Sequence, residues 1–492
     1  MKPRSAPQYQ CQCQKRKSLI VFESDDPSWL SLNLAIAKYV RSTEGDFDVL
    51  DVRDIDFLGF SKRRWAAGES RKDVLFDRLQ LTSHNRVLIP ESIRRPQDRP
   101  TPSWLNQSSE SALFSYLKTP NPRKSAFLYR KIKRRLEVDA LSIHDYCLDQ
   151  FSIKHYCKVY VRNGRFPLQA AVVEAAKQFK ISVVFWERGV SADTMYVGGN
   201  APQDWRSVKD FHESFTPSSA QLLTAKEWLT RRTHLVAGSD RFSTNLFSKR
   251  FDASKSSLGE GGPRQSSQLS FFTSSQDEFW ALGSLWPKPD WENQYSAFNK
   301  VLKTAGKARA LYPVVRMHPN TIRKSPLYVL SEVRSVSKLK AVHPDLRIVW
   351  PHQSENSYDL ASASQWVLVW NSTMGMEAMF LGCNVRHLAE SPFPLASKSN
   401  LLTPQGLHSF WEIESGLGQK RKINHEIAVQ SVAARLARNL ISIEAIPVPL
   451  KRGKLRSLLM ANSFLSIALL VNYHLWRQFA NVTFRIAGRL VR

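Results

Sequence analysis

The chain has 492 residues, of which 42% are hydrophobic and 23% are charged. These values exclude a disordered or fibrous chain, and the length is too great for one ordinary domain but suits two. Lysine and arginine number 70 against 43 acidic residues, a net charge of +27. Nucleic acid, anionic lipid and phosphorylated molecules all remain open as partners of such a surface. The short basic clusters at 62–64 and 130–135 are either a solvated face or a binding patch.

The five cysteines argue against a disulfide scaffold, because their number is odd, and favour a reducing compartment. Cys11 and Cys13 are too close for an ordinary zinc pair, and no later Cys or His pair has zinc spacing, so no metal site is expected. The N-terminus is basic, but no apolar run behind it is long enough for a secretory signal. We therefore expect a cytoplasmic protein.

The segment 457–476 is the one membrane candidate. It is apolar on average, but Asn462, Asn472 and His474 interrupt it, and basic residues flank it on both sides. It is a poor match to a spanning helix, which needs about 20 predominantly apolar residues. Two interpretations stay open: an amphipathic helix on the inner face of the cytoplasmic membrane, or a terminal helix packed on the protein.

Composition divides the chain into four parts. Residues 253–268 are rich in Ser and Gly with no apolar period, which predicts a linker. Residues 17–252 then form an N-terminal domain and residues 269–440 a C-terminal domain. A basic helical tail is expected over 441–492.

The N-terminal part has the pattern of alternating strands and helices. A strand is expected at 18–22, followed by Asp26 and Pro27 as helix cap and first helical residue. A second unit has a strand at 159–161, a helix opened by Pro167, and a buried strand at 181–186. The helix is expected to bury one face with helical spacing, formed by Leu168, Ala171, Val172, Ala175, Ala176 and Phe179.

The C-terminal part repeats this style. Strands are expected at 269–273, 314–317 and 365–370, then a short helix at 374–381 closed by Gly382, and a further strand from Asn384. A strand–helix–strand unit favours parallel pairing. The fold class predicted is therefore α/β, with two Rossmann-like domains and C-terminal helices.

Polar residues follow five of the expected strands. In open α/β sheets ligands bind beyond the carboxyl ends of the strands, so these segments are expected to converge on one site. Each segment alone is a weak signal. The five segments are Asn163-Gly164-Arg165, Glu187-Arg188-Gly189, Ser274-Ser275, His318-Pro319-Asn320 and Asn371-Ser372-Thr373.

The Asn371-Ser372-Thr373 segment precedes a helix, where amides and hydroxyls suit a phosphate, although helix capping is the alternative. A capping box needs Glu three residues after the cap, and Glu377 is four after Thr373. We therefore expect Glu377 to be free to accept hydrogen bonds from a ligand.

The spacing from Ser275 to Glu278 does fit a capping box, so these two residues are interpreted as starting a helix. Ser274, one residue earlier, can still face a phosphate.

Three charged residues complete the candidates. Arg316 and His318 lie on the same face of an ideal strand and together suit a phosphate, with a structural histidine as the alternative. Glu187 ends an apolar strand and suits a general base. Its alternative is an ion pair with Arg165, which otherwise can hold an anionic acceptor.

Two patterns are set aside. Asp54 and Asp56 form a D-x-D of the kind that metal-dependent transferases use, but the pattern is short and common by chance. The glycine run 259–262 opens no helix, so it is not a dinucleotide fingerprint.

The order of motifs resembles a known family. "RMHPN" and "SENSYDLASASQWVLVWNSTMGMEAMFLG" resemble the C-terminal signature of bacterial capsule polysaccharide biosynthesis proteins, and "NGRF", "FWERG" and "FFTSSQDEF" resemble their other motifs. The resemblance spans 159–388. It departs at Cys383-Asn384, where the family commonly has Lys-Pro. That family is similar to GT-B glycosyltransferases, including the capsule Kdo transferases.

The resemblance implies two domains facing a cleft and the transfer of a sugar from a nucleotide sugar to a capsule or lipopolysaccharide glycan. It implies Glu187 as the base and no metal or other cofactor. The alternatives are polyol-phosphate transfer, as in teichoic acid polymerases, and a non-catalytic polyanion-binding protein; nucleic acid is not expected. Acceptor contacts are expected from Asn163, Arg165, Arg188 and Gly189, and nucleotide-sugar contacts from Ser274, Arg316, His318, Pro319, Asn371, Ser372, Thr373 and Glu377.

Overall fold

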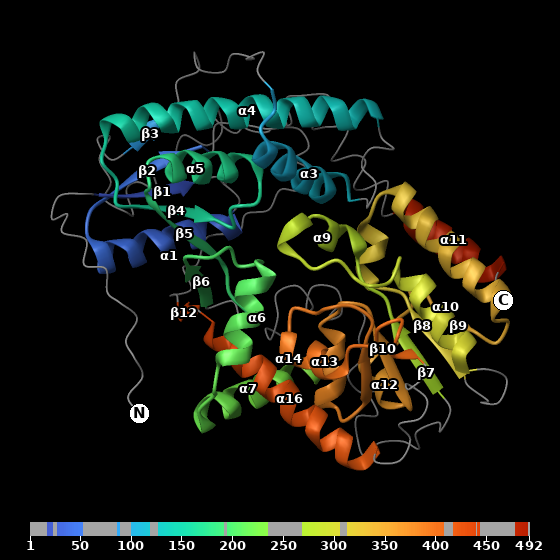
Figure 1. Cartoon of the computed structure of the whole chain (residues 1–492). Coiled ribbons are helices and arrows are strands. Elements are labelled where there is room, and N and C mark those ends of the chain that lie inside the picture. The colour runs from blue at the N-terminus through green and yellow to red at the C-terminus, as the bar shows by residue number, and fades with distance from the viewer. Residues whose placement is uncertain are drawn as a thin grey trace.

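The computed structural model describes residues 17–22, 27–52, 86–88, 100–118, 126–190, 194–234, 268–305, 312–407, 417–438, 440–442 and 478–490. They form two α/β domains, each built on one mainly parallel sheet (Figure 1). The predicted fold class of two Rossmann-like domains is confirmed. Asp54, Asp56, the glycine run, residues 253–267 of the expected linker and the segment 457–476 lie outside the described residues, whereas Gln268 is already part of the second domain's sheet.

The first domain holds a seven-stranded sheet of order β12-β6-β5-β4-β1-β2-β3. All neighbours are parallel except at β6, which is antiparallel to both β5 and β12. Its strands are β1 (Ser18–Phe22), β2 (Phe47–Asp51), β3 (Arg86–Leu88), β4 (Lys158–Arg162), β5 (Ser182–Arg188), β6 (Thr194–Gly198) and β12 (Leu440–Ser442).

Alternation along β1 assigns the two faces of this sheet. Leu19 and Val21 pack in the cluster formed with α4 and α5, whereas Ile20 and Phe22 pack in the cluster formed with α1. The layers are therefore helix, sheet, helix, which is the solution for a parallel sheet that must be buried on both faces. The helices are α1 (Pro27–Glu44), α3 (Ser103–Leu117), α4 (Ala126–Ile153) and α5 (Pro167–Gln178).

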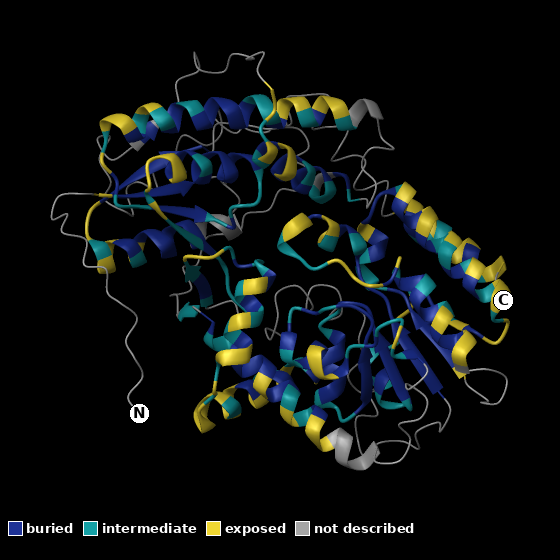
Figure 2. Cartoon of the chain, in the orientation of Figure 1, coloured by how far each residue is buried: buried dark blue, intermediate teal, exposed yellow. Residues whose placement is uncertain are grey.

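The second domain holds a five-stranded, wholly parallel sheet of order β11-β10-β7-β8-β9. Its strands are β7 (Gln268–Phe272), β8 (Tyr312–Arg316), β9 (Arg347–Val349), β10 (Trp366–Val369) and β11 (Asn384–His387). Helices α10 (Gln294–Ala305) and α11 (Pro326–Val342) cover one face, together with a helix at 478–490. The strands are buried throughout the middle of the domain (Figure 2).

The other face of this sheet is covered by shorter helices and by two elements that cross between the domains. Helix α7 (Ser219–Thr233) precedes the expected linker but packs on α13 and α16. Helix α16 (Leu417–Ala437) runs back toward the first domain, where β12 pairs with β6 (Figure 1). The remaining elements are α6 (Trp205–Ser214), α9 (Gln276–Trp280), α12 (Ser357–Ser362), α13 (Met374–Phe380), α14 (Pro394–Asn400) and the short 3-10 helices Gly283–Leu285 and Pro319–Arg323.

The predicted strands agree with the structure to within two or three residues at each end, and α13 ends before Gly382, whose φ is +73°. Two details were wrong. The strand at 181–186 is half-buried along most of its length, although Trp186 is buried. Phe179 is 40% exposed, because α5 ends at Gln178 and Phe179 no longer belongs to its buried face.

Candidate functional site

A pocket of about 300 Å³ lies where the two domains meet, and residues of both line it. The first domain contributes the end of β5 and Tyr196, and the second contributes the turn before α13 and the segment at Pro392 and Phe393. The two crossing helices contribute Trp228 and Arg232 from α7 and Arg435 from α16. The remaining lining residues are Val190, Pro202, Gln203, Arg438 and Leu440. The charged lining residues are Glu187, Arg188, Arg232, Arg435 and Arg438.

A sharp turn after the neighbouring strand β4 positions Glu187. Asn163 and Gly164 both have positive φ, 59° and 81°. A Cβ on Gly164 would lie 2.3 Å from Cε1 of Phe185, so the turn needs glycine there, while Asn tolerates the left-handed region. The turn lets Nδ2 of Asn163 donate to Oε2 of Glu187 at 2.7 Å, and the Arg188 backbone N–H donates to Oε1 at 3.0 Å. Two donors therefore fix the carboxylate.

Gly189 and Arg165 have different roles beside this carboxylate. A Cβ on Gly189 would lie 2.2 Å from Oγ1 of Thr194, so glycine permits the chain to approach β6, where the Gly189 N–H donates to the Thr194 carbonyl at 2.9 Å. Arg165 donates to the carbonyl of Ala281 at 3.3 Å and stacks on Phe166. Burial lowers the pKa of Arg165, and Glu187 partly offsets this. Arg165 thus connects the two domains and is not part of the pocket lining.

The pocket is rich in guanidinium groups. Arg438 donates to the carbonyl of Pro202 at 2.9 Å and to Oγ of Ser207 at 3.1 Å, and it stacks on Tyr196. Arg435, one turn earlier on α16, has no hydrogen-bond or ion-pair partner within the described part of the chain. Burial, and then the neighbouring charge of Arg438, lower the pKa of Arg435 to about 10. A desolvated cation of this kind favours an anion beside it.

Glu377 does not face the pocket as a free acceptor. It is 3% exposed, its Oε1 pairs with Nε of Arg232, and its Oε2 accepts from the hydroxyl of Tyr358 at 3.0 Å. Our expectation that Glu377 is free to bind a ligand was therefore wrong. The physical reason is tertiary: α7 packs against α13 and brings a guanidinium to the carboxylate, whose remaining face is closed by Tyr358.

His318 is held by its own turn and by the end of β7. Its Nδ1 accepts from the backbone N–H of Asn320 at 3.2 Å and lies 3.2 Å from Oγ of Ser275. An accepting Nδ1 places the proton of the neutral ring on Nε2. Burial lowers the pKa of His318 to about 4, although Glu278 nearby acts in the opposite direction.

The capping box expected from Ser275 to Glu278 does not form. Ser275 makes no side-chain cap to α9, because its hydroxyl faces His318. Glu278 and Asp277 instead accept from Nζ of Lys324, at 3.1 Å and 2.8 Å. The competing partners are long-range contacts, which capping rules do not consider.

The side chain of Arg316 is buried and bonded to backbone carbonyls, so it is not open to a phosphate. It is 3% exposed and donates to the carbonyl of Trp350 at 2.9 Å and to that of Gln353 at 3.4 Å. Burial lowers its pKa to about 10, with Glu355 acting in the opposite direction. These bonds hold the loop that follows β9.

The other predicted residues lie at the carboxyl ends of β7, β8 and β10. Ser274 is fixed through its backbone to the side chain of Gln294, and its buried hydroxyl has no hydrogen-bond partner among the described residues. Pro319 begins a 3-10 helix, and Oγ of Ser372 accepts from the backbone of Met374 at 3.2 Å. The side chain of Asn371 is buried.

The structure thus brings four of the predicted residues into the pocket lining: Glu187, Arg188, Gly189 and Thr373. The sequence reasoning missed Trp228 and Arg232 on α7, Arg435 on α16, and Arg438 directly after that helix. A signal for the last two exists, because they are three residues apart and share one side of a helix that is otherwise apolar there.

The described residues contain neither a cluster of metal-ligating side chains nor a helix suited to span a membrane. No group of three or more His, Cys, Asp or Glu side chains in this part of the chain is placed to hold a metal ion. No described helix has both the length and the apolar character that crossing a bilayer demands.

No protein-family model and no curated protein matches the chain. Solved structures with a similar fold include KpsC, beta Kdo 2,4 transferase, from Thermosulfurimonas dismutans, at 14% identity over 48% of this chain and 70% of that chain, with a TM-score of 0.32. They also include UDP-GlcNAc 2-epimerase from Neisseria meningitidis, bound to UDP-GlcNAc, at 13% identity over 85% and 97% of the two chains, with a TM-score of 0.30. Two Kdo transferases are among the solved structures that match the chain.

The buried pair of Arg232 and Glu377 is expected to behave as a unit. Arg232→Met leaves a buried carboxylate without its cation and should lower the free energy of unfolding by about 3–5 kcal/mol. Adding Glu377→Gln should recover part of this loss, since the amide still accepts from Tyr358. Urea unfolding of the two single variants and the double variant checks the coupling. Strictly additive effects would contradict it.

His318 should make stability depend on pH. Its pKa is about 4 in the folded chain and about 6.5 when unfolded. The unfolded state therefore binds the proton more readily, and stability is lost as the pH falls from about 6.5 to 4, by at most about 3 kcal/mol. His318→Asn keeps the Nδ1-type acceptor and should lose less stability over this range, with the exposed His155→Asn as control. Parallel curves for wild type and His318→Asn would show that His318 does not contribute.

Proposed function

We propose that this protein is a glycosyltransferase that moves a sugar from a nucleotide-sugar donor to a glycan or glycolipid acceptor of the capsule or lipopolysaccharide type. The observation that carries the proposal is the composition of one pocket: Glu187 from the first domain and Thr373 from the second line it together, beside four arginines. A carboxylate and an excess of guanidinium groups are the two elements that this reaction requires.

In the proposed reaction Glu187 takes the proton of the acceptor hydroxyl. The acceptor oxygen then bonds to the anomeric carbon, while the bond from that carbon to the donor's phosphate oxygen breaks and the nucleotide leaves. Negative charge grows on the leaving phosphate, and Arg435 is the cation with no competing partner in the described chain. Since its guanidinium is already desolvated, it stabilises that charge more strongly than it would in water.

The arginines supply the positive charge that a divalent cation supplies in metal-dependent transferases, so the proposed mechanism requires neither a metal nor another cofactor. Asn163 acts through Glu187, because its amide orients the carboxylate. The phosphate contact first assigned to Arg316 passes to Arg435, since the guanidinium of Arg316 donates to two backbone carbonyls.

Two further functions are compatible with parts of the structure. Polyol-phosphate transfer would use the same arginines on a phosphate, and its product would retain that phosphate, which a glycosyl-transfer product lacks. A non-catalytic polyanion binder would use the charge alone and would not need a fixed Glu187.

We also propose that the protein works at the inner face of the cytoplasmic membrane, where a glycolipid acceptor would lie.

Glu187→Gln tests the mechanism. The amide keeps the size of the side chain but cannot take a proton, so turnover should fall about 100-fold or more. Affinity for the nucleotide sugar, measured by calorimetry, should change less than about twofold, because Glu187 contacts the acceptor. Glu174→Gln, on the exposed side of α5, is the matched control. Full activity of Glu187→Gln would remove this residue from the mechanism.

Arg435→Ala tests the anion-binding part. Removing the unpartnered guanidinium should weaken the affinity for nucleotide sugars about 10- to 100-fold, the range of one charge-assisted contact. Arg435→Lys should restore some of it. A thermal-shift screen against CMP-, UDP- and GDP-sugars identifies the donor first, since a ligand of the folded state raises its stability. Unchanged affinity in Arg435→Ala would contradict the proposed site.

A further inference from the structure

The helix at 478–490 has a buried inner side. Ala480, Phe484 and Ala487 belong to the core of the second domain, and the ring of Phe484 lies 5.8 Å from that of Trp350. Gly488 lies against the same tryptophan, where a Cβ would come within 3.2 Å of its Nε1. The inner side therefore fixes the helix to the fold.

The outer side of this helix is also apolar. Val482, Ile486 and Leu490 are 56%, 52% and 81% exposed, and Phe479 is 38% exposed. Their spacing of three, four and four residues places them in one row along the helix. The domain core covers only the inner side of this thirteen-residue helix, so the outer apolar side remains exposed.

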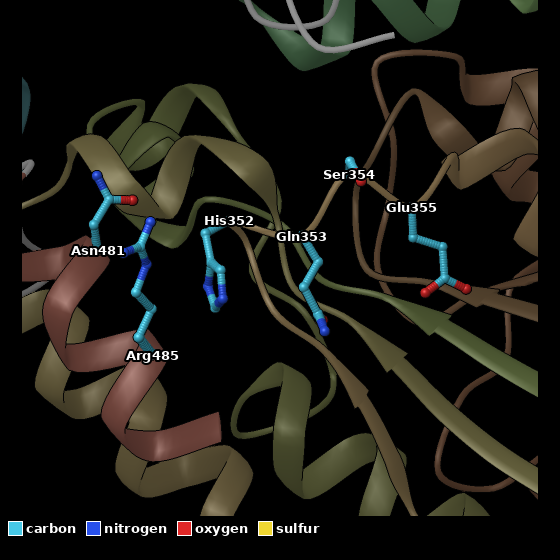
Figure 3. A pocket seen from close by; sticks show the side chains of 6 residues that line it. All are labelled: His352, Gln353, Ser354, Glu355, Asn481 and Arg485. Atoms are coloured by element: carbon cyan, nitrogen blue, oxygen red, sulfur yellow. The ribbon is translucent and has the colours of Figure 1, made fainter. Parts of the chain in front are cut away.

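Polar side chains separate the two apolar sides. Asn481 and Arg485 extend from the helix toward His352 and line an open pocket of about 670 Å³ (Figure 3). A second pocket of about 490 Å³ adjoins it and is lined by Arg485 and Arg489. Helical spacing puts these two arginines along the border of the apolar row.

The charge of this region is positive. The two pockets are lined by Lys340, Arg347, Arg485 and Arg489 against Asp345 and Glu355. Glu355 is already occupied by Arg347, whose Nη2 donates to its two oxygens at 2.8 Å and 2.7 Å. Residues 478–490 contain no acidic side chain.

We infer that the outer side of the helix at 478–490 is a docking surface for a bilayer containing anionic phospholipid. An apolar row bordered by arginines is the arrangement of an interfacial helix: the row enters the acyl boundary, and the guanidinium groups reach the phosphates. The polar pockets beside Arg485 then lie at headgroup level. This surface is outside the interdomain pocket, so the inference does not depend on the proposed reaction.

A second copy of the chain fits this surface less well. In a two-fold symmetric contact the same surface meets itself, so the arginines that border the row on one copy would approach those of the other copy. The region contains too few unpaired carboxylates to offset them, because Glu355 is held by Arg347. An anionic membrane satisfies both the apolar row and the arginines.

The experiment is flotation of the full-length protein with vesicles of phosphatidylcholine alone and of phosphatidylcholine with phosphatidylglycerol. Wild type should float with the anionic vesicles, and Val482→Asp with Ile486→Asp should lower the bound fraction about tenfold. Arg485→Gln with Arg489→Gln should remove most of the dependence on phosphatidylglycerol. Ile153→Asp, at a 73% exposed apolar position on α4, is the matched control and should bind like wild type.

The outcomes separate the alternatives. Equal flotation of wild type and the Val482/Ile486 variant overturns the inference, as does a wild type that fails to float but forms a dimer which this variant disrupts. Thermal unfolding confirms that the variants fold. Turnover with a water-soluble acceptor should be the same in wild type and in the Val482/Ile486 variant. A loss of vesicle binding is thus distinguishable from a failure of the proposed transferase reaction.

Discussion

The ion pair between Arg232 and Glu377 is the contact on which the interdomain site depends. It joins α7, which precedes the second domain in sequence, to α13 within that domain. Both side chains are nearly buried, so neither charge is stable without the other. The pair also fixes the position of the Arg232 side chain, which lines the pocket and whose guanidinium stacks on Trp228. The carboxylate that resembles a ligand contact in sequence is thus a structural support for the site.

Two crossing elements give the pocket its cations. Helix α16 packs on α7 and α13 in the second domain, and β12 directly after it pairs with β6 in the first. Arg435 and Arg438 lie at the end of α16, where the chain passes from one domain to the other. Because Glu187 stands on β5, next to β6, the same crossing brings the arginines to the carboxylate. Any ligand bound here contacts residues from both domains.

The sequence predicted the elements well and their partners poorly. Short apolar runs located the strands, and proline and glycine signals located helix starts and ends. The rule of carboxyl strand ends located Glu187, Arg188, Gly189 and Thr373. What failed was every inference that required knowing a distant neighbour. Ser275 has a hydroxyl that suits a cap, but this hydroxyl lies 3.2 Å from Nδ1 of His318 and makes no cap hydrogen bond to α9. Arg316 and Glu377 are satisfied by groups 34 and 145 residues away in sequence, and no local pattern encodes such pairings.

The net charge of +27 can now be divided by location. Part of the basic cluster at 130–135 is compensated on the surface of α4, where Lys133 pairs with Glu137 and Arg135 with Asp139. Each of these cations has a carboxylate one helical turn away, so the pairs leave little attraction for an outside anion. Among the described residues, Arg435 in the interdomain pocket and Arg485 and Arg489 on the helix at 478–490 have no ion pair with a carboxylate, although Arg232 in the same pocket is paired with Glu377. It is therefore the position of the uncompensated charge, and not its total, that favours a phosphate in the pocket and an anionic bilayer at the outer helix.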